Sequence, residues 1–110
     1  MYKIAIVTVS DKGARGERVD ESGPVIRDIV KSLGEVVTNL VVPDDPDVLM
    51  ETMIDLSDRE KVDLLFTTGG TGLAPRDNTP EATLAVIDRE VPGLAEAMRM
   101  ESMKKTSHAM

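Results

Sequence analysis

Apolar residues gather in three short runs along the chain, and each run is followed by a polar segment and then by an amphipathic one. The runs cover residues 3–9, 36–42 and 62–66. Short continuous apolar stretches bounded by turn residues are typical of strands that are buried on both faces. The strands alternate with segments of helical spacing, and this alternation predicts a parallel sheet with helices packed on its faces.

The first predicted helix begins at Ser22, a residue type that favours the N-cap, and has Pro24 in its first turn. Gly34 is the residue expected just beyond its C-terminus. Residues 10–20, which precede the helix, are polar and are expected to form a loop. Apolar positions at helical spacing predict one buried face, formed by Val25, Ile26, Ile29, Val30 and Leu33.

The second predicted helix follows the second strand. Asp45 is its expected N-cap and Pro46 its expected first residue, a combination that suits the start of a helix. Its apolar stripe consists of Leu49, Met50, Met53, Ile54 and Leu56.

Two more helices are expected in the last third of the chain. Thr79 and Pro80 predict the N-cap and first residue of the third helix, which the Pro-Gly pair at residues 92–93 is expected to end. The fourth helix is expected over residues 94–105. Its methionines, and one beyond it, are expected to serve packing or an interface rather than a metal site: Met98, Met100, Met103 and Met110.

These elements predict an α/β fold in a single domain covering residues 1–110. Only three strands are visible in the pattern, so the expected sheet is small. An antiparallel strand hidden in the pattern, a sheet completed by another chain, and an incomplete chain all remain open as explanations.

Composition narrows the functional classes. The net charge of −7 and the 2% of aromatic residues argue against nucleic-acid binding, which depends on basic and stacking side chains. Without cysteine there is no disulfide, thiolate metal site or thiol nucleophile. The sequence shows neither a leader pattern nor an apolar run long enough for a membrane span, so we expect a cytoplasmic protein that does not associate with membranes.

Three polar segments follow the three predicted strands. Ser10 and Asp11 follow the first, Asp44 and Asp45 the second, and residues 69–77 the third. Ligands of open parallel sheets bind beyond the carboxyl ends of the strands, so these segments are expected to meet at one binding edge. Ser10 and Asp11 could either bind polar ligand atoms or simply end their strand.

The segment after the third strand reads TTGGTGLAPRDNTPEAT, from Thr67 to Thr83. Successive backbone N–H groups of a glycine-rich turn can point the same way and bind an anion, and glycine lets the backbone approach a phosphate closely. Arg76 could neutralise phosphate charge there, or could simply be an exposed loop arginine. The plainer alternative is a strand-to-helix turn with surplus glycine.

Asp44 and Asp77 are two carboxylates that helix capping does not require, because Asp45 and Thr79 are the expected caps. A pair of carboxylates beside a phosphate site suits Mg²⁺, which takes one or two carboxylates together with phosphate oxygens and water. A solvated acidic loop is the alternative. The single histidine, His108, lies in a polar C-terminal stretch and is not expected to be catalytic.

The motifs TVSD, PDD, TTGGTG, RD and TPEAT, continued by DREVPGLAEAMR, closely resemble the molybdopterin-binding family of the MogA and MoaB type. The resemblance implies a three-layer α/β/α fold, a homotrimer or higher homo-oligomer, and Mg²⁺- and ATP-dependent transfer of AMP to molybdopterin with release of pyrophosphate. It is also compatible with a partner protein that inserts molybdenum.

The resemblance places the family's metal-binding and catalytic aspartates on Asp44 and Asp77. It assigns phosphate or pterin binding to Thr67, Thr68, Gly69, Gly70, Thr71, Gly72, Arg76, Ser10 and Asp11. Family members continue beyond this point into further strands and a loop of the LPGSP kind, whereas this sequence stops at His108-Ala109-Met110. Two alternatives to an adenylyltransferase are therefore a non-catalytic molybdopterin-binding module and an oligomerisation unit.

Overall fold

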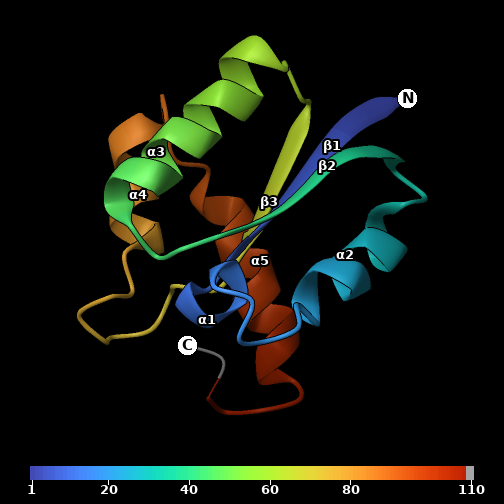
Figure 1. Cartoon of the computed structure of the whole chain (residues 1–110). Helices are drawn as coiled ribbons and strands as arrows, with labels where there is room; N and C mark the ends of the chain where they lie inside the picture. The colour runs from blue at the N-terminus through green and yellow to red at the C-terminus, as the bar shows by residue number, and fades with distance from the viewer. Residues whose placement is uncertain (109–110) are drawn as a thin grey trace.

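The computed structural model describes residues 1–108 and contains a sheet of three parallel strands. The strands are β1 (Tyr2–Val9), β2 (Gly34–Val42) and β3 (Leu64–Thr68), in the spatial order β2-β1-β3 (Figure 1). The parallel sheet expected from the apolar runs is confirmed. The third strand begins and ends two residues later than expected, so that Thr67 and Thr68 belong to the strand.

Helices cover both faces of the sheet, giving the three layers of the α/β/α architecture. α3 (Pro46–Ile54) and α4 (Thr79–Val86) lie on one face, where they pack with alternate residues of β1. α2 (Ser22–Val30) lies on the other face and packs with the remaining residues of that strand. Because side chains alternate along a strand, the central strand contributes to both cores and is buried throughout from Ile4 to Val9.

The start of α3 agrees with the sequence prediction. The Asp45 carboxylate accepts hydrogen bonds from the backbone N–H groups of Asp47 (2.9 Å) and Val48 (3.1 Å), and Pro46 occupies the first helical turn. The helix continues into a π-helical segment, η1 (Asp55–Arg59). Leu56 at this junction is 1% exposed and completes the apolar stripe that fixes the segment to the sheet.

Several helix boundaries differ from the sequence prediction. The expected loop at residues 10–20 contains a short helix, α1 (Asp11–Ala14), which Ser10 caps by accepting a hydrogen bond from the Gly13 N–H (3.0 Å). Gly34 is the first residue of β2 rather than a helix stop, because α2 already ends before Lys31.

The N-caps of α2 and α4 were also wrongly predicted. Glu21, not Ser22, is the N-cap of α2, and Asn78, not Thr79, is the N-cap of α4; neither cap side chain makes a capping bond. In both helices an aspartate outside the helix accepts a hydrogen bond from one N–H group at the helix start: Asp20 from Gly23 and Asp44 from Asn78.

The predicted buried face of α2 is only partly buried. Ile26 and Val30 pack on the sheet, whereas Val25, Ile29 and Leu33 are at least half exposed. A helical pattern shows which side chains could be buried together. A three-stranded sheet is too narrow to cover the whole face.

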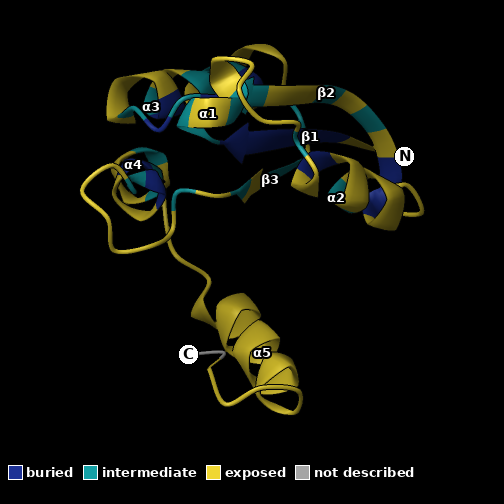
Figure 2. Ribbon diagram, turned by 60° about the horizontal axis from the view of Figure 1, so that its bottom comes forward, coloured by how far each residue is buried: buried dark blue, intermediate teal, exposed yellow. Residues whose placement is uncertain are grey.

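The last helix, α5 (Pro92–Met103), contains no buried residue and stands away from the sheet (Figure 2). It begins at Pro92, so that the Pro-Gly pair opens this helix instead of ending α4, which stops at Val86. Met98, Met100 and Met103 are exposed in the described chain, and Met110 lies outside the described residues.

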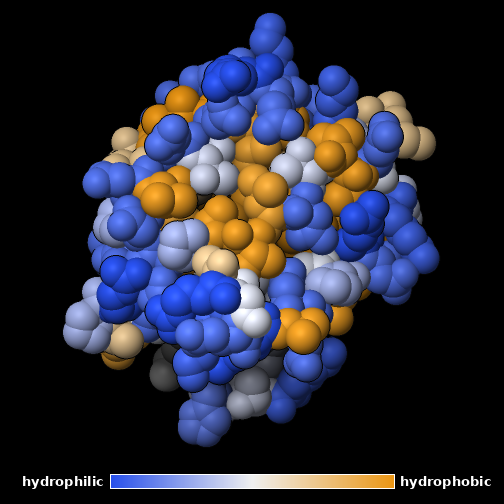
Figure 3. Space-filling model, viewed as in Figure 1, coloured by the Kyte–Doolittle hydropathy of each residue, from blue (hydrophilic) through white to orange (hydrophobic). Residues whose placement is uncertain are grey.

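An uncovered apolar surface accompanies the small sheet. β3 is an edge strand in the described chain, and Figure 3 shows a hydrophobic strip across the middle of the molecule, where β3 lies in Figure 1. A hollow of about 640 Å³ lies along this surface, and its lining includes Met53, Leu65, Thr67 and Ile87. In the part of the chain that the structure describes, no helix is both long and apolar enough to cross a membrane.

Candidate functional site

The three polar segments meet at the carboxyl edge of the sheet, as the sequence indicated. The Ser10 N–H donates to the Val42 carbonyl oxygen (2.8 Å), and the Asp44 N–H donates to Asp11 Oδ1 (3.0 Å). These two bonds join the end of β1 to the end of β2. β3 ends beside them and leads into the glycine loop, residues 69–78.

Two glycines shape the start of the glycine loop. Gly69 has φ +93° and Gly70 has φ +65°, a region of backbone space that other residues rarely adopt. A Cβ atom on Gly69 would overlap the Val9 carbonyl oxygen, and one on Gly70 would lie 2.8 Å from Asp44 Oδ2. Glycine is required here because the loop runs against both the first strand and a carboxylate.

Thr79 fixes the same stretch from the α4 side. Its hydroxyl donates to the Gly69 carbonyl oxygen (3.0 Å) and its N–H donates to the Gly70 carbonyl oxygen (3.1 Å). Thr79 is 4% exposed. Its hydroxyl is therefore committed to holding the loop and does not cap the helix as the sequence pattern suggested.

Asp44 is a buried carboxylate at the centre of the edge, only 4% exposed. Its Oδ1 accepts a hydrogen bond from the Asn78 N–H (3.0 Å), so Asp44 caps α4 from the segment that follows β2. Burial raises the pKa of Asp44 above its ordinary value, and the hydrogen bond from Asn78 opposes this effect. The neighbouring negative charges of Asp77 and Asp11 raise the pKa further.

Asp77 lies on the same loop. Its Oδ2 accepts a hydrogen bond from the Ala74 N–H (3.0 Å) and lies 2.7 Å from the position of a Cβ on Gly72. The carboxylates of Asp44 and Asp77 thus border the glycine loop at Gly70 and Gly72. Within residues 1–108 no three or more His, Cys, Asp or Glu side chains gather as a metal site. Two carboxylates beside a glycine-rich loop nevertheless fit Mg²⁺, which takes one or two carboxylates and completes its shell with other oxygen ligands and water.

Arg76 is held by Asp11 in the structure. Its Nε and Nη2 donate to the two carboxylate oxygens at 3.1 and 2.8 Å, a bidentate pair. The pKa of Asp11 is lowered, first by the hydrogen bond from Arg76 and then by that from the Asp44 N–H. The pair ties the glycine loop to α1, and the Arg76 side chain stays 62% exposed at the edge of the site.

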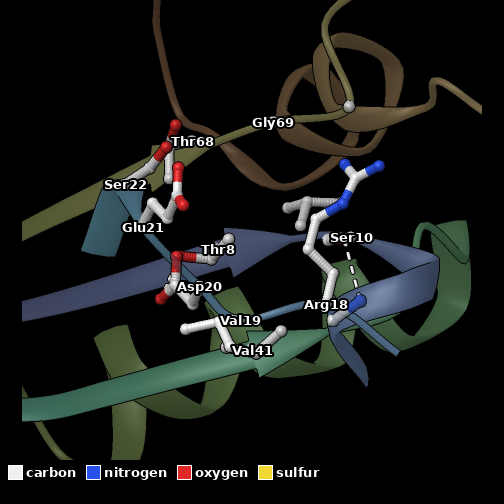
Figure 4. Close-up of a pocket in the computed structure, with 13 residues that line it drawn as sticks. Thr8, Ser10, Arg18, Val19, Asp20, Glu21, Ser22, Val41, Thr68 and Gly69 are labelled. Carbon is white, nitrogen blue, oxygen red and sulfur yellow. Dashed lines mark hydrogen bonds between the residues drawn. The ribbon is translucent and has the colours of Figure 1, made fainter. Parts of the chain in front are cut away.

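A cavity of about 570 Å³ opens beside the glycine loop, on the α2 side of the sheet (Figure 4). Four of the residues singled out in the sequence line it: Ser10, Thr68, Gly69 and Gly70. Asp11, Asp44, Thr71, Gly72, Arg76 and Asp77 do not line it. Thr67 points to the other face of the sheet, because it alternates with Thr68 along β3.

The remaining wall of the cavity consists of residues that the sequence did not assign to a binding site. They are Thr8, Val9, Gly13, Arg18, Val19, Asp20, Glu21, Ser22 and Val41. One signal was present: Thr8 is a polar residue within an apolar strand, on the same face of the strand as the buried Ile4 and Ile6. A hydroxyl at a buried position needs a partner, and its partner here is Asp20.

The sequence matches a family model described as a probable molybdopterin binding domain over residues 5–110. Among curated proteins, the chain is 41% identical over 110 residues to a molybdopterin adenylyltransferase of Pyrococcus furiosus, covering 98% of this chain and 63% of that protein. It is 40% identical over 105 residues to a molybdopterin adenylyltransferase of Escherichia coli K12, covering 92% of this chain and 53% of that protein. The chain therefore spans less than two thirds of the length of these relatives.

The solved structures agree with this similarity. A molybdopterin biosynthesis enzyme MoaB from Thermus thermophilus superposes with a TM-score of 0.91 at 50% sequence identity, covering 99% of this chain and 69% of that structure. The fold of the described chain is thus that of the MoaB structure over nearly its whole length.

Proposed function

The chain belongs to the molybdopterin-binding domain family, and from that premise we propose that it acts in molybdenum cofactor biosynthesis by transferring AMP from Mg²⁺-ATP to molybdopterin. One observation carries the proposal: the carboxylates of Asp44 and Asp77 border a glycine loop at the carboxyl edge of a parallel sheet. Carboxylates and backbone N–H groups at one edge are the groups that phosphoryl-transfer chemistry requires.

In the proposed reaction, an oxygen of the terminal phosphate of molybdopterin attacks the α-phosphorus of ATP. The bond from that phosphorus to the bridging oxygen breaks, and pyrophosphate leaves with the electron pair. Two polyanions must approach each other, so the protein has to position them and offset their charge.

The residues at the edge are suited to these tasks. Backbone N–H groups of the glycine loop can bind phosphate oxygens. Asp44 and Asp77 would hold Mg²⁺, which when bound offsets phosphate charge. Both carboxylates are already oriented by backbone donors, from Asn78 and Ala74, so little freedom is lost when substrate binds. Arg76 could add positive charge where it borders the loop.

The decisive measurement is release of pyrophosphate from Mg²⁺-ATP in the presence of molybdopterin. We expect release that depends on the pterin and falls at least about 100-fold in Asp77→Asn, by analogy with loss of an electrostatic group from an active site. Asp28→Asn is the matched control, because it removes an exposed carboxylate on α2 whose one ion pair within residues 1–108 is with Lys31. Full turnover in Asp77→Asn would refute the role assigned to Asp77.

A second candidate is a non-catalytic module that binds molybdopterin. It is favoured by the pairing of Arg76 with Asp11, which leaves the guanidinium occupied in the structure. This candidate predicts that the wild-type chain binds the pterin without releasing pyrophosphate. Equilibrium binding of molybdopterin, measured together with pyrophosphate release, separates the two candidates.

Three expectations from the sequence remain predictions: a homotrimer or higher homo-oligomer, a cytoplasmic location, and interaction with a protein that inserts molybdenum. The exposed apolar side chains of α5 support the first of these, the homo-oligomer.

A further inference from the structure

The segment of residues 15–22 forms the outer wall of the cavity beside the glycine loop. It follows α1 and precedes the first full turn of α2. Arg18, Val19, Glu21 and Ser22 line the cavity from this segment, across from Thr68 and Gly69 (Figure 4). Most of the segment is exposed, with Val19 at 81%. The position of this wall therefore depends on how the segment is attached to the sheet.

Asp20 supplies the attachment. Its Oδ2 accepts a hydrogen bond from the Thr8 hydroxyl (3.0 Å), and its Oδ1 accepts one from the Gly23 N–H (3.0 Å). One carboxylate thus joins the centre of the sheet to the first turn of α2. The N-cap of α2, Glu21, makes no capping bond, so Asp20 satisfies an N–H group of this helix end in its place.

The two partners of Asp20 are constrained by their surroundings. Thr8 is 8% exposed and its side chain lies on the α2 face of the sheet, directly under the segment. Gly23 is buried, and a Cβ there would overlap Asp20 Oδ2. The Asp20 carboxylate therefore sits between the buried Thr8 hydroxyl and Gly23, whose lack of a side chain leaves room for it. We call this contact of three residues the Asp20 junction.

The cavity and the carboxylate pair share the glycine loop. Gly69 and Gly70 line the cavity, and Asp44 Oδ2, which does not line it, lies 2.8 Å from the Cβ position of Gly70. A molecule in the cavity would therefore be presented to the reacting phosphates by this loop. A change in the cavity wall should therefore affect the affinity for that molecule more strongly than it affects the rate of the chemical step.

We propose that Asp20 is a positioning residue, which joins Thr8 to the first turn of α2 and thereby holds residues 15–22 as the wall of a cavity that receives one of the two substrates. This inference rests on the proposed function. It adds a residue and a role that lie outside the carboxylate pair and the glycine loop.

Thr8→Val and Thr8→Ser form the matched test pair. The valine variant removes the hydroxyl and keeps a β-branched side chain in the strand, whereas the serine variant keeps the hydroxyl. We expect Thr8→Val to raise the KM for either molybdopterin or ATP, and not for both, by about tenfold with kcat changed less than about threefold. Thr8→Ser should stay close to the wild type. Asp20→Ala should raise the same KM at least as much as Thr8→Val, because it removes the bonds to both Thr8 and Gly23. Adding Thr8→Val to Asp20→Ala should change the KM little further, because the bond between the two residues is already lost.

Amide hydrogen exchange in the free protein provides a readout that does not depend on activity. We expect faster exchange at residues 18–23 in Thr8→Val, with exchange in β1 and α3 unchanged. Thr38→Val is the control for loss of a hydroxyl, because it removes a β2 hydroxyl that makes an exposed hydrogen bond to Glu60. It should change neither exchange nor KM.

The results separate this proposal from the proposed function. If the wild type neither binds the pterin nor releases pyrophosphate, the proposed function fails. The role of Asp20 is then still tested by hydrogen exchange, because unchanged exchange at residues 18–23 in Thr8→Val would overturn it. If the wild type is active, unchanged KM values in Thr8→Val overturn the inference and leave the function intact. A uniform loss of kcat with general destabilisation would also overturn it, because that result describes a structural residue only.

Discussion

At the scale of single residues, the site is built from polar groups that are satisfied before any ligand binds. Asp44 accepts from the Asn78 N–H, Asp77 from the Ala74 N–H, and Asp11 from Arg76. Asp44 differs from the other two because its carboxylate is buried and its pKa is raised, so its ionised form costs stability. A group that costs stability at a binding edge is expected where function requires its charge.

Asp44→Asn should separate stability from activity. The folded-state pKa of Asp44 is raised, so its protonated form contributes favourably to the free energy of unfolding. This contribution is fully present below the unfolded-state pKa of about 3.9 and is lost as the pH rises through the folded-state pKa. At pH 7 the ionised carboxylate therefore lowers the free energy of unfolding. The asparagine removes this cost and keeps an oxygen that can accept from Asn78.

We expect Asp44→Asn to melt at the same temperature as the wild type or higher at pH 7, and to lose AMP transfer. The difference in melting temperature should shrink as the pH falls towards the unfolded-state pKa. Thermal unfolding followed by circular dichroism over this pH range tests the expectation. A wild type that is clearly more stable than Asp44→Asn at pH 7 would show that the ionised Asp44 carboxylate does not destabilise the protein.

Gly69→Ala should destabilise the protein. The alanine would have to adopt φ +93°, and its Cβ would meet the Val9 carbonyl, a backbone atom that cannot turn away. We expect the free energy of unfolding to fall by about 1–3 kcal/mol. Gly93→Ala is the control, because a Cβ there meets nothing within 4 Å and φ is not positive, so its stability should be unchanged or slightly higher. Urea denaturation of both variants measures the difference, and equal stabilities would show that the loop relaxes.

At the scale of elements, the helix starts differ in whether the capping carboxylate also ties the helix to the sheet. α3 is capped by the residue that precedes it, Asp45. α4 takes its cap from Asp44, which lies 34 residues from Asn78, whereas α2 takes its cap from Asp20, a near neighbour in sequence that also accepts from Thr8 on β1. These two carboxylates tie the first turns of α4 and α2 to the sheet at the binding edge.

Asp45→Ala and Ser22→Ala test this division. Asp45→Ala removes two capping bonds and should lower the free energy of unfolding by about 0.5–2 kcal/mol. Ser22→Ala should have almost no effect, because Ser22 is exposed and is not the N-cap of α2. Chemical denaturation of the two variants gives the comparison. An equal loss in both would mean that Ser22 caps α2 in solution after all.

At the scale of the whole molecule, the core ends before α5 begins. None of its residues is buried, and the large apolar side chains Leu94 and Met98 are 69% and 70% exposed. A helix of 12 residues without tertiary packing is marginal in water. We therefore expect α5 to be covered by a second copy of the chain, in keeping with the self-association expected from the sequence.

The double variant Leu94→Glu with Met98→Glu places two charges one helical turn apart on this helix. It should lower the sedimentation coefficient towards that of an 11.9 kDa monomer and make the melting temperature independent of concentration. Glu96→Gln, an exposed change on the same helix, should leave the association intact. A wild type that sediments as a monomer at every concentration would contradict the expectation.

The sequence by itself determined the strands, their parallel arrangement and the edge at which function is expected. An apolar run such as residues 3–9 has to be buried on both sides, and strands joined through helices run parallel, so their polar ends must meet. Tight turns also leave a local signature, which is why Gly69 and Gly70 could be singled out before the structure was known.

Only the tertiary structure decided which polar groups pair. Arg76 and Asp11 are 65 residues apart, Asn78 and Asp44 are 34 apart, and Thr8 and Asp20 are 12 apart. Local rules instead assigned the cap of α4 to Thr79, because they compare only neighbours in sequence and Asp44 lies 34 residues from Asn78. Hydrophobic spacing likewise marks the face that α2 could bury, but the width of the sheet fixes how much of it is covered. Long-range pairs and available surface are properties of the folded chain, which local sequence patterns do not contain.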